Sequence, residues 1–166
     1  MEVRQLNSQF EHAEGRLTGV IPYDSPTTIT ERGKTFTEVL RAGCFRSSTA
    51  GDVICTYNHQ PHRLLGRVAS GTLTLTDSPQ GLRWSVALPE HASDVREMVA
   101  RGDLSGCSFT FTTRANGERW TGSTRELVDL NLYELGPVVT PAYTQSSVAM
   151  RSSDLYRAKL ELRARI

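Results

Sequence analysis

Residues 105–113 read Ser-Gly-Cys-Ser-Phe-Thr-Phe-Thr-Thr, and this stretch indicates how the chain folds. Three of its side chains, Cys107, Phe109 and Phe111, alternate with hydroxyl side chains. A period of two is typical of a β-strand that has one face in the core. We therefore expect Cys107 to be buried beside the aromatic rings as a small hydrophobic residue. Ser108 should point the other way, toward solvent or a cleft.

The segments on either side of this stretch are also regular. Upstream, Ser93–Arg101 has the pattern of a helix that begins at a serine and ends before Gly102. Before it, Gly71–Thr76 and Leu82–Leu88 alternate like two strands of a hairpin, since proline and glycine lie between them. Downstream, Thr124–Glu134 alternates again. The sequence therefore predicts a mainly β protein with peripheral helices.

The strands are short, and we expect them to form a closed or strongly curved antiparallel β-barrel. The polar residues 1–14 are predicted to be a flexible or strand-forming leader, and residues 15–151 a single domain. Residues 25–35, rich in Thr, Pro and Gly, are predicted to be a long loop. Residues 152–166 are predicted to be a basic C-terminal helix or tail.

Composition narrows the classes of function. The 166 residues carry a net charge of +1, with 38% hydrophobic and 22% charged residues, as in an ordinary soluble protein. This balance favours neither nucleic acid nor a membrane as partner. Three cysteines at wide spacings argue against a disulfide framework and favour a reducing compartment.

Two side chains have the chemistry of a general base and a nucleophile. His59 follows the apolar run Val53–Tyr57, and Pro61 fixes the chain direction just after it. A serine such as Ser108 becomes a useful nucleophile when a histidine takes its proton and a third group orients that histidine. The alternative for His59 is an ordinary loop histidine. The alternative for Ser108 is one more hydroxyl on a threonine-rich strand face.

A carboxylate is the usual third group. Glu134 comes at the end of an apolar strand, and regular alternation would place it on the same strand face as Leu130 and Leu132. Asp129 and Asp103 are rivals for this role. An exposed carboxylate at a strand end is the alternative interpretation of Glu134.

Cysteine-based readings compete with the serine reading. Cys107 is intrinsically the better nucleophile, but adjacent strand residues point to opposite faces, so Cys107 and Ser108 cannot both meet one histidine. The spacing of Cys55, His59 and His62 also allows zinc, although no fourth ligand lies nearby in the sequence. We predict that the protein uses neither a metal nor a cofactor.

Three blocks of sequence carry a resemblance to a known family. They are Tyr57–Pro61 (YNHQP) with Leu65–Val68 (LGRV), Leu104–Phe111 (LSGCSFTF), and Leu132–Tyr143 (LYELGPVVTPAY) with Ser146–Ala149. Together they resemble the prohead serine proteases of tailed phages, which are related to the herpesvirus maturational proteases, the assemblins. Two positions depart from the family pattern, since Gln60 stands where an acidic residue is expected and Gly136 where serine is expected.

The resemblance implies an assemblin-like β-barrel with His59 as general base, Ser108 as nucleophile and Glu134 as the acidic third member. It also implies a serine endopeptidase that cleaves the scaffold, or the scaffold-like segment of the major capsid protein, and itself. Such an enzyme works in the host cytoplasm inside assembling proheads, and self-association is left open. A non-catalytic capsid-assembly or scaffold module on the same fold is the alternative.

Overall fold

The computed structural model describes residues 1–7, 10–13, 15–31, 33–104 and 106–139. Within these residues, the strands form one five-stranded and two four-stranded sheets. The C-terminal helix predicted for residues 152–166 lies outside the described residues. No helix in the described part of the chain is long and apolar enough to cross a membrane.

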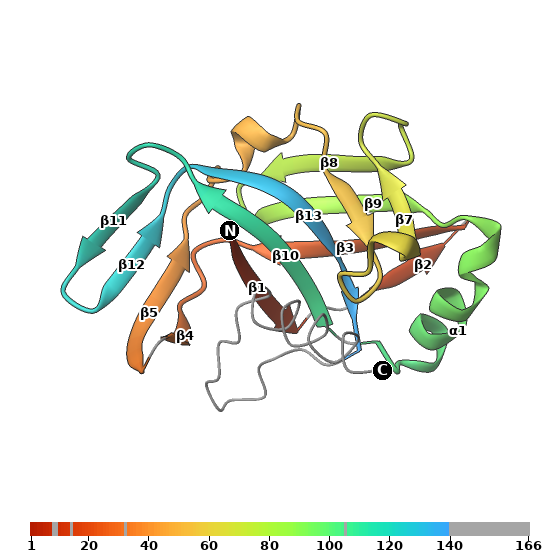
Figure 1. Ribbon diagram of the computed structural model, residues 1–166, viewed down its shortest axis with the longest axis horizontal. Helices are drawn as coiled ribbons and strands as arrows, with labels where there is room; N and C mark the ends of the chain where they lie inside the picture. The colour runs from red at the N-terminus through yellow and green to blue at the C-terminus, as the bar shows by residue number, and fades with distance from the viewer. Residues whose placement is uncertain (8–9, 14, 32, 105, 140–166) are drawn as a thin grey trace, which may run out of the picture.

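The five-stranded sheet has the order β1 (Glu2–Asn7), β10 (Gly106–Thr113), β13 (Leu130–Val138), β6 (Ile54–Thr56) and β7 (Leu64–Arg67). Its neighbours are antiparallel except β13 and β6, which are parallel. The strands β10 and β13 of this sheet cross the middle of Figure 1, in front of β3.

The remaining strands form the two four-stranded sheets, one at the left of Figure 1 and one that runs behind β10 and β13 toward the right. One has the order β11 (Glu118–Thr121), β12 (Thr124–Leu127), β5 (Lys34–Leu40) and β4 (Thr27–Glu31). The other has the order β2 (Glu11–Ala13), β3 (Arg16–Pro22), β9 (Gly81–Ala87) and β8 (Leu73–Ser78). Strand β4 occupies part of the segment predicted to be a long loop, so that prediction is wrong.

The prediction of a closed or strongly curved barrel is wrong. The described strands lie in separate sheets, and none of these sheets is closed or strongly curled. Strands β1 and β7 are the two opposite edges of the central sheet and do not meet. Alternation along a strand determines which side chains face the core, but it does not specify which strands pair, and closure depends on pairing. The mainly β character is as expected.

The helix α1 (Ser93–Arg101) is confirmed, with Gly102 in the left-handed conformation at its C-terminus. Three short 3₁₀ turns, η1 (Arg46–Ser48), η2 (Pro61–Arg63) and η3 (Glu90–Ala92), complete the described elements. The β8–β9 hairpin is confirmed as well.

The core forms where the inward faces of the sheets meet. Phe109 packs edge-on against Phe45 with ring centroids 5.6 Å apart, and its ring lies 5.7 Å from that of Phe111. Cys107 is fully buried beside them, as the alternation predicts. Strand β10 thus turns one face to the core and leaves Ser108 and Thr110 on the other.

Within the segment predicted to be a flexible or strand-forming leader, Glu2–Asn7 forms β1 and pairs with β10. Buried charges fasten this strand to the β11–β4 sheet. Arg4 Nε lies 2.5 Å from Glu38 Oε1, and Arg125 Nη1 lies 3.1 Å from Glu38 Oε2 and 2.6 Å from Glu2 Oε2. The side chains of Arg4 and Glu38 are only 7% and 4% exposed. A polar leader therefore becomes an edge strand because its charges are paired inside the molecule.

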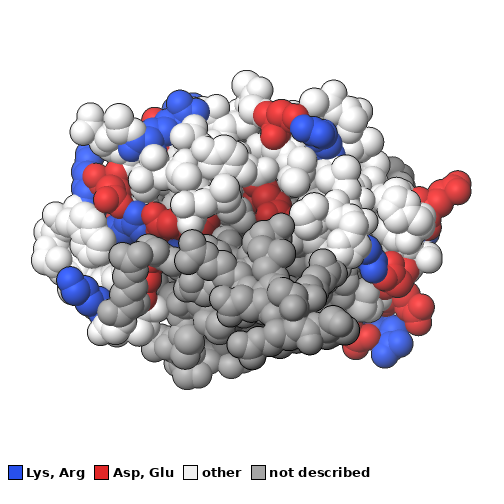
Figure 2. Space-filling model, in the orientation of Figure 1, with Lys and Arg blue, Asp and Glu red and all other residues white. Residues whose placement is uncertain are grey.

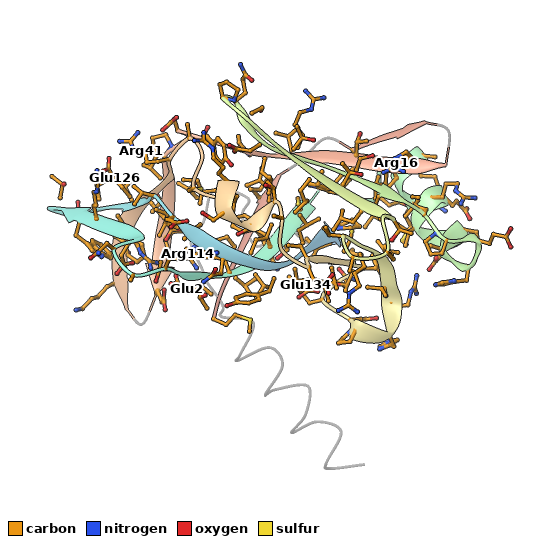
Figure 3. The ribbon with its side chains drawn as sticks, turned by 90° about the horizontal axis from the view of Figure 1, so that it is seen from above. Glu2, Arg16, Arg41, Arg114, Glu126 and Glu134 are labelled. Atoms are coloured by element: carbon orange, nitrogen blue, oxygen red, sulfur yellow. The ribbon has the colours of Figure 1, made fainter. Side chains whose placement is uncertain are left out.

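Exposed charges are mixed in sign. On the face shown in Figure 2, acidic and basic side chains are interspersed, in line with the net charge of +1. Many exposed charged side chains form ion pairs. Examples are Arg41 with Glu126, both labelled in Figure 3, and Arg63 with Asp94 at 2.5 Å.

Candidate active site

The three residues predicted to carry the chemistry come from different parts of the central sheet. Ser108 lies on β10, Glu134 on the adjacent β13, and His59 in the turn that leaves β6. Because β13 pairs with both β10 and β6, it brings the ends of these segments together. Figure 3 shows Glu134 where β13 (blue) meets the β6–β7 region (yellow).

The structure brings all three side chains into contact. His59 Nε2 lies 2.5 Å from Ser108 Oγ, and His59 Nδ1 lies 3.1 Å from Glu134 Oε2. An ionised carboxylate can only accept hydrogen bonds, so this arrangement puts the neutral ring's proton on Nδ1. Nε2 is then free to accept the serine proton. The order serine, imidazole and carboxylate is the one that activates a hydroxyl for acyl transfer.

Two threonine hydroxyls hold the carboxylate in place. Thr56 Oγ1, at the end of β6, donates to Glu134 Oε1, and Thr110 Oγ1 donates to Oε2 at 3.4 Å. Both threonines are buried. The sequence analysis missed them, although alternation along β10 places Thr110 on the same face as Ser108. Thr56 had no sequence signal, because its role depends on the parallel pairing of β6 with β13.

The surroundings of Glu134 favour its ionised form. Burial by itself would raise the pKa of this carboxyl. The hydrogen bond and the charge attraction from His59, together with the hydroxyls of Thr56 and Thr110, outweigh burial and hold the pKa below its ordinary value. At neutral pH Glu134 is therefore an anion that can orient the imidazole.

Ser108 faces away from Phe109, as predicted, but it is fully buried rather than open to solvent. Its Oγ also donates to the backbone oxygen of Arg4 at 3.1 Å, because β1 lies directly beside β10. The hydroxyl thus has two acceptors, His59 and Arg4.

The turn that carries His59 has an unusual backbone. Asn58 and His59 have φ values of 53° and 54°, in the left-handed region. This conformation costs a non-glycine residue about 1–2 kcal/mol, less for asparagine, which tolerates it best. Strain of this kind persists only where neighbouring groups hold the backbone.

Gly136 lies opposite Ser108 on β13, at the position where the family pattern leads us to expect serine. A Cβ atom added here would lie 1.9 Å from the backbone oxygen of Thr56. The glycine therefore lets β6 approach β13 more closely than any side chain would. That approach brings the histidine turn to the serine strand.

The rival residues lie elsewhere. Asp129 Oδ1 lies 3.6 Å from Arg114 Nε, and Asp103 Oδ2 lies 2.9 Å from Arg101 Nε, so each carboxylate pairs with an arginine. Cys107 is fully buried, and burial raises the pKa of its thiol to about 12. Neither the two aspartates nor this cysteine is among the described contacts of His59.

In the part of the chain that the structure describes, the residues of the zinc interpretation do not form a metal site. Cys55 is fully buried, and burial raises the pKa of its thiol well above the ordinary value. His62 is exposed on η2, whereas His59 contacts Ser108 and Glu134. Within the described residues, no three His, Cys, Asp or Glu side chains are grouped to hold a metal ion.

Comparison with known proteins agrees with the resemblance seen in the sequence. Neither the curated proteins nor the solved structures include a significant match. A family model described as caudovirus prohead serine protease matches residues 4–160, which is most of the chain and includes His59, Ser108 and Glu134. The chain therefore belongs to the caudovirus prohead serine protease family.

Proposed function

We propose that this protease is an endopeptidase in which Ser108 is the nucleophile, His59 the general base and Glu134 the group that orients His59. One observation carries the proposal: the imidazole lies 2.5 Å from the serine oxygen through Nε2 and 3.1 Å from the carboxylate through Nδ1. A base within hydrogen-bond reach of a hydroxyl, and itself held by a carboxylate, is the arrangement that nucleophilic catalysis requires.

The reaction proceeds in two halves. Ser108 Oγ attacks the carbonyl carbon of the peptide while His59 Nε2 takes its proton. Glu134 stabilises the imidazolium that forms, and His59 then gives its proton to the leaving amine. In the second half, His59 takes a proton from water, which attacks the acyl-enzyme, and Ser108 leaves with that proton restored.

The substrates follow from where such enzymes work. A prohead protease acts in assembling proheads, with capsid proteins as substrates. We propose more specifically that the chain cleaves the scaffold or the scaffold-like segment of the major capsid protein, and that it cleaves itself. We also propose that it works in the host cytoplasm without a nucleic-acid or membrane partner, and that it can associate with itself.

The experiment is co-expression with the cognate major capsid protein, followed by intact-mass measurement of every product. We expect wild type to shorten the capsid protein, and Ser108→Ala and His59→Ala to leave it at full length. The proposal fails if both variants still shorten it. If wild type leaves the capsid protein intact inside assembled proheads, the non-catalytic assembly module is the better account.

A matched control distinguishes the loss of a catalytic residue from general damage to the fold. His62 lies three residues after His59 but is exposed on η2. His62→Ala should therefore cleave as wild type does. The same variant tests the zinc alternative, in which His62 is a ligand and its loss abolishes activity. A chelator should likewise leave cleavage unchanged.

A further inference from the structure

Asn58 links the histidine turn to strand β13 through two hydrogen bonds. Its backbone N–H donates to the oxygen of Pro137 at 3.1 Å, and its side-chain Oδ1 accepts from the backbone N–H of Val139 at 2.9 Å. Pro137 and Val139 are two residues apart along the chain. Asn58 therefore fastens to the end of the strand that carries Glu134, and no described contact joins it to Ser108.

The backbone of this turn needs such a fastening. Asn58 and the following His59 both have positive φ values, 53° and 54°. Two successive residues in this region stay there only if the surroundings hold them. Asparagine suits the first position because it tolerates the left-handed conformation. A glycine would tolerate it too, but would lack the oxygen that accepts from Val139.

Strand β13 carries Glu134 and pairs with β10, the strand that carries Ser108. Glu134 lies opposite Thr110, and Gly136 lies opposite Ser108. A turn fastened to β13 is therefore fixed relative to both partners of its histidine. Catalysis is sensitive to such placement, since a displacement of about 1 Å can lower a rate roughly 10²-fold.

We propose that Asn58 is a positioning residue, which sets the distance and direction of His59 Nε2 toward Ser108 Oγ by anchoring the histidine turn to Pro137 and Val139. This inference rests on the proposed function. Asn58 acts through the backbone of its neighbour and touches no reacting atom. Its removal should therefore slow the chemical step and leave substrate binding almost unchanged.

The test compares Asn58→Gly with Asn58→Asp. Glycine adopts a positive φ freely and keeps the fold, but removes the acceptor; aspartate has the same shape and keeps an acceptor oxygen. We expect kcat for capsid-protein cleavage to fall about 10- to 100-fold in Asn58→Gly with little change in KM. Asn58→Asp should restore a rate close to that of wild type. Thermal unfolding of each variant establishes that it is folded.

Two results would overturn the positioning role. One is an unchanged kcat in folded Asn58→Gly; the other is an equal loss of kcat in both variants. Ser108→Ala, measured alongside, separates this failure from a failure of the proposed function. Cleavage that persists in Ser108→Ala refutes the proposed function. Cleavage that is lost in Ser108→Ala but undiminished in Asn58→Gly refutes the role of Asn58 alone.

Discussion

Thr110 and Glu134 lie opposite each other across β10 and β13, directly beside a β-bulge. Leu132 pairs with the next residue of β10, which leaves Tyr133 as the extra residue of the bulge. Consequently Leu132 and Leu135 both face the core, although they are three residues apart. Regular alternation from Leu132 would have buried Glu134. The bulge instead turns this carboxylate outward, to the face that carries the site.

The orienting role of Glu134 predicts a large effect of Glu134→Gln. Glutamine has nearly the same size, but its amide can donate to His59 Nδ1 and so favour the tautomer that protonates Nε2. We expect kcat to fall about 10²- to 10⁴-fold while KM changes little. Steady-state cleavage of the capsid protein measures both. An activity close to that of wild type would exclude Glu134 from the site.

The same residue predicts how stability depends on pH. Its pKa is lower in the folded protein than its ordinary value of about 4.3. The ionised carboxylate therefore contributes stability that is fully present above that ordinary value and is lost as pH falls through the folded pKa. Urea unfolding from neutral pH to about pH 3 should show wild type losing stability faster than Glu134→Gln below about pH 4.3. Parallel curves would contradict this.

The close approach of β6 to β13 predicts that Gly136→Ala harms both stability and activity. Its Cβ would meet the backbone oxygen of Thr56, and backbone cannot move aside as a flexible side chain can. Overpacking of this kind costs about 1–3 kcal/mol, and the strands must separate just where the histidine turn begins. Denaturant unfolding and capsid-protein cleavage measure the two effects.

The control for Gly136→Ala is Gly71→Ala. Gly71 has a positive φ of 71°, but a Cβ added there meets no atom within 4 Å. This substitution should cost about 1–2 kcal/mol from backbone conformation and leave the rate of cleavage unchanged. Equal losses of activity in the two variants would show that general destabilisation, not strand spacing, is responsible.

The buried charges that hold β1 predict a large loss of stability in Glu38→Gln. This change removes the buried carboxylate that Arg4 and Arg125 share and leaves Glu2, 2.9 Å from Arg4, as the remaining partner; breaking a buried pair costs up to about 3–5 kcal/mol. Glu97→Gln is the matched control, because its pairing with Arg101 at 3.5 Å is exposed to solvent. Urea unfolding should show little change in the control. A similar stability for the two variants would mean that the network contributes nothing.

Much of the site was predictable because it depends on local pattern. Alternation placed Cys107 in the core and Ser108 on the opposite face, and the family resemblance pointed to His59 and Glu134 as its partners. The structure places the three side chains in contact, and their catalytic roles stay a prediction. Ser108 was predicted to face solvent or a cleft, but it is fully buried, with its Oγ against His59 and the backbone oxygen of Arg4 on the neighbouring β1.

What the sequence could not supply depends on pairing between distant segments. The charges of Glu2 and Arg4 on β1 find their partners in Arg125 and Glu38, which lie far along the chain. Thr56 reaches Glu134 only because β6 runs parallel to β13. The separation of the sheets, in place of a barrel, likewise depends on strand order and not on alternation. Such relationships leave no periodic signal along the chain.

The central claim, that Ser108 is the nucleophile and His59 its base, is tested most directly by covalent trapping. A fluorophosphonate is added under conditions in which wild type cleaves the capsid protein, and the adduct is located by peptide mass mapping. We predict one adduct on Ser108 in wild type and none in His59→Ala, with Cys107 unmodified. An adduct on another residue, or labelling of Ser108 that is undiminished in His59→Ala, would contradict the account.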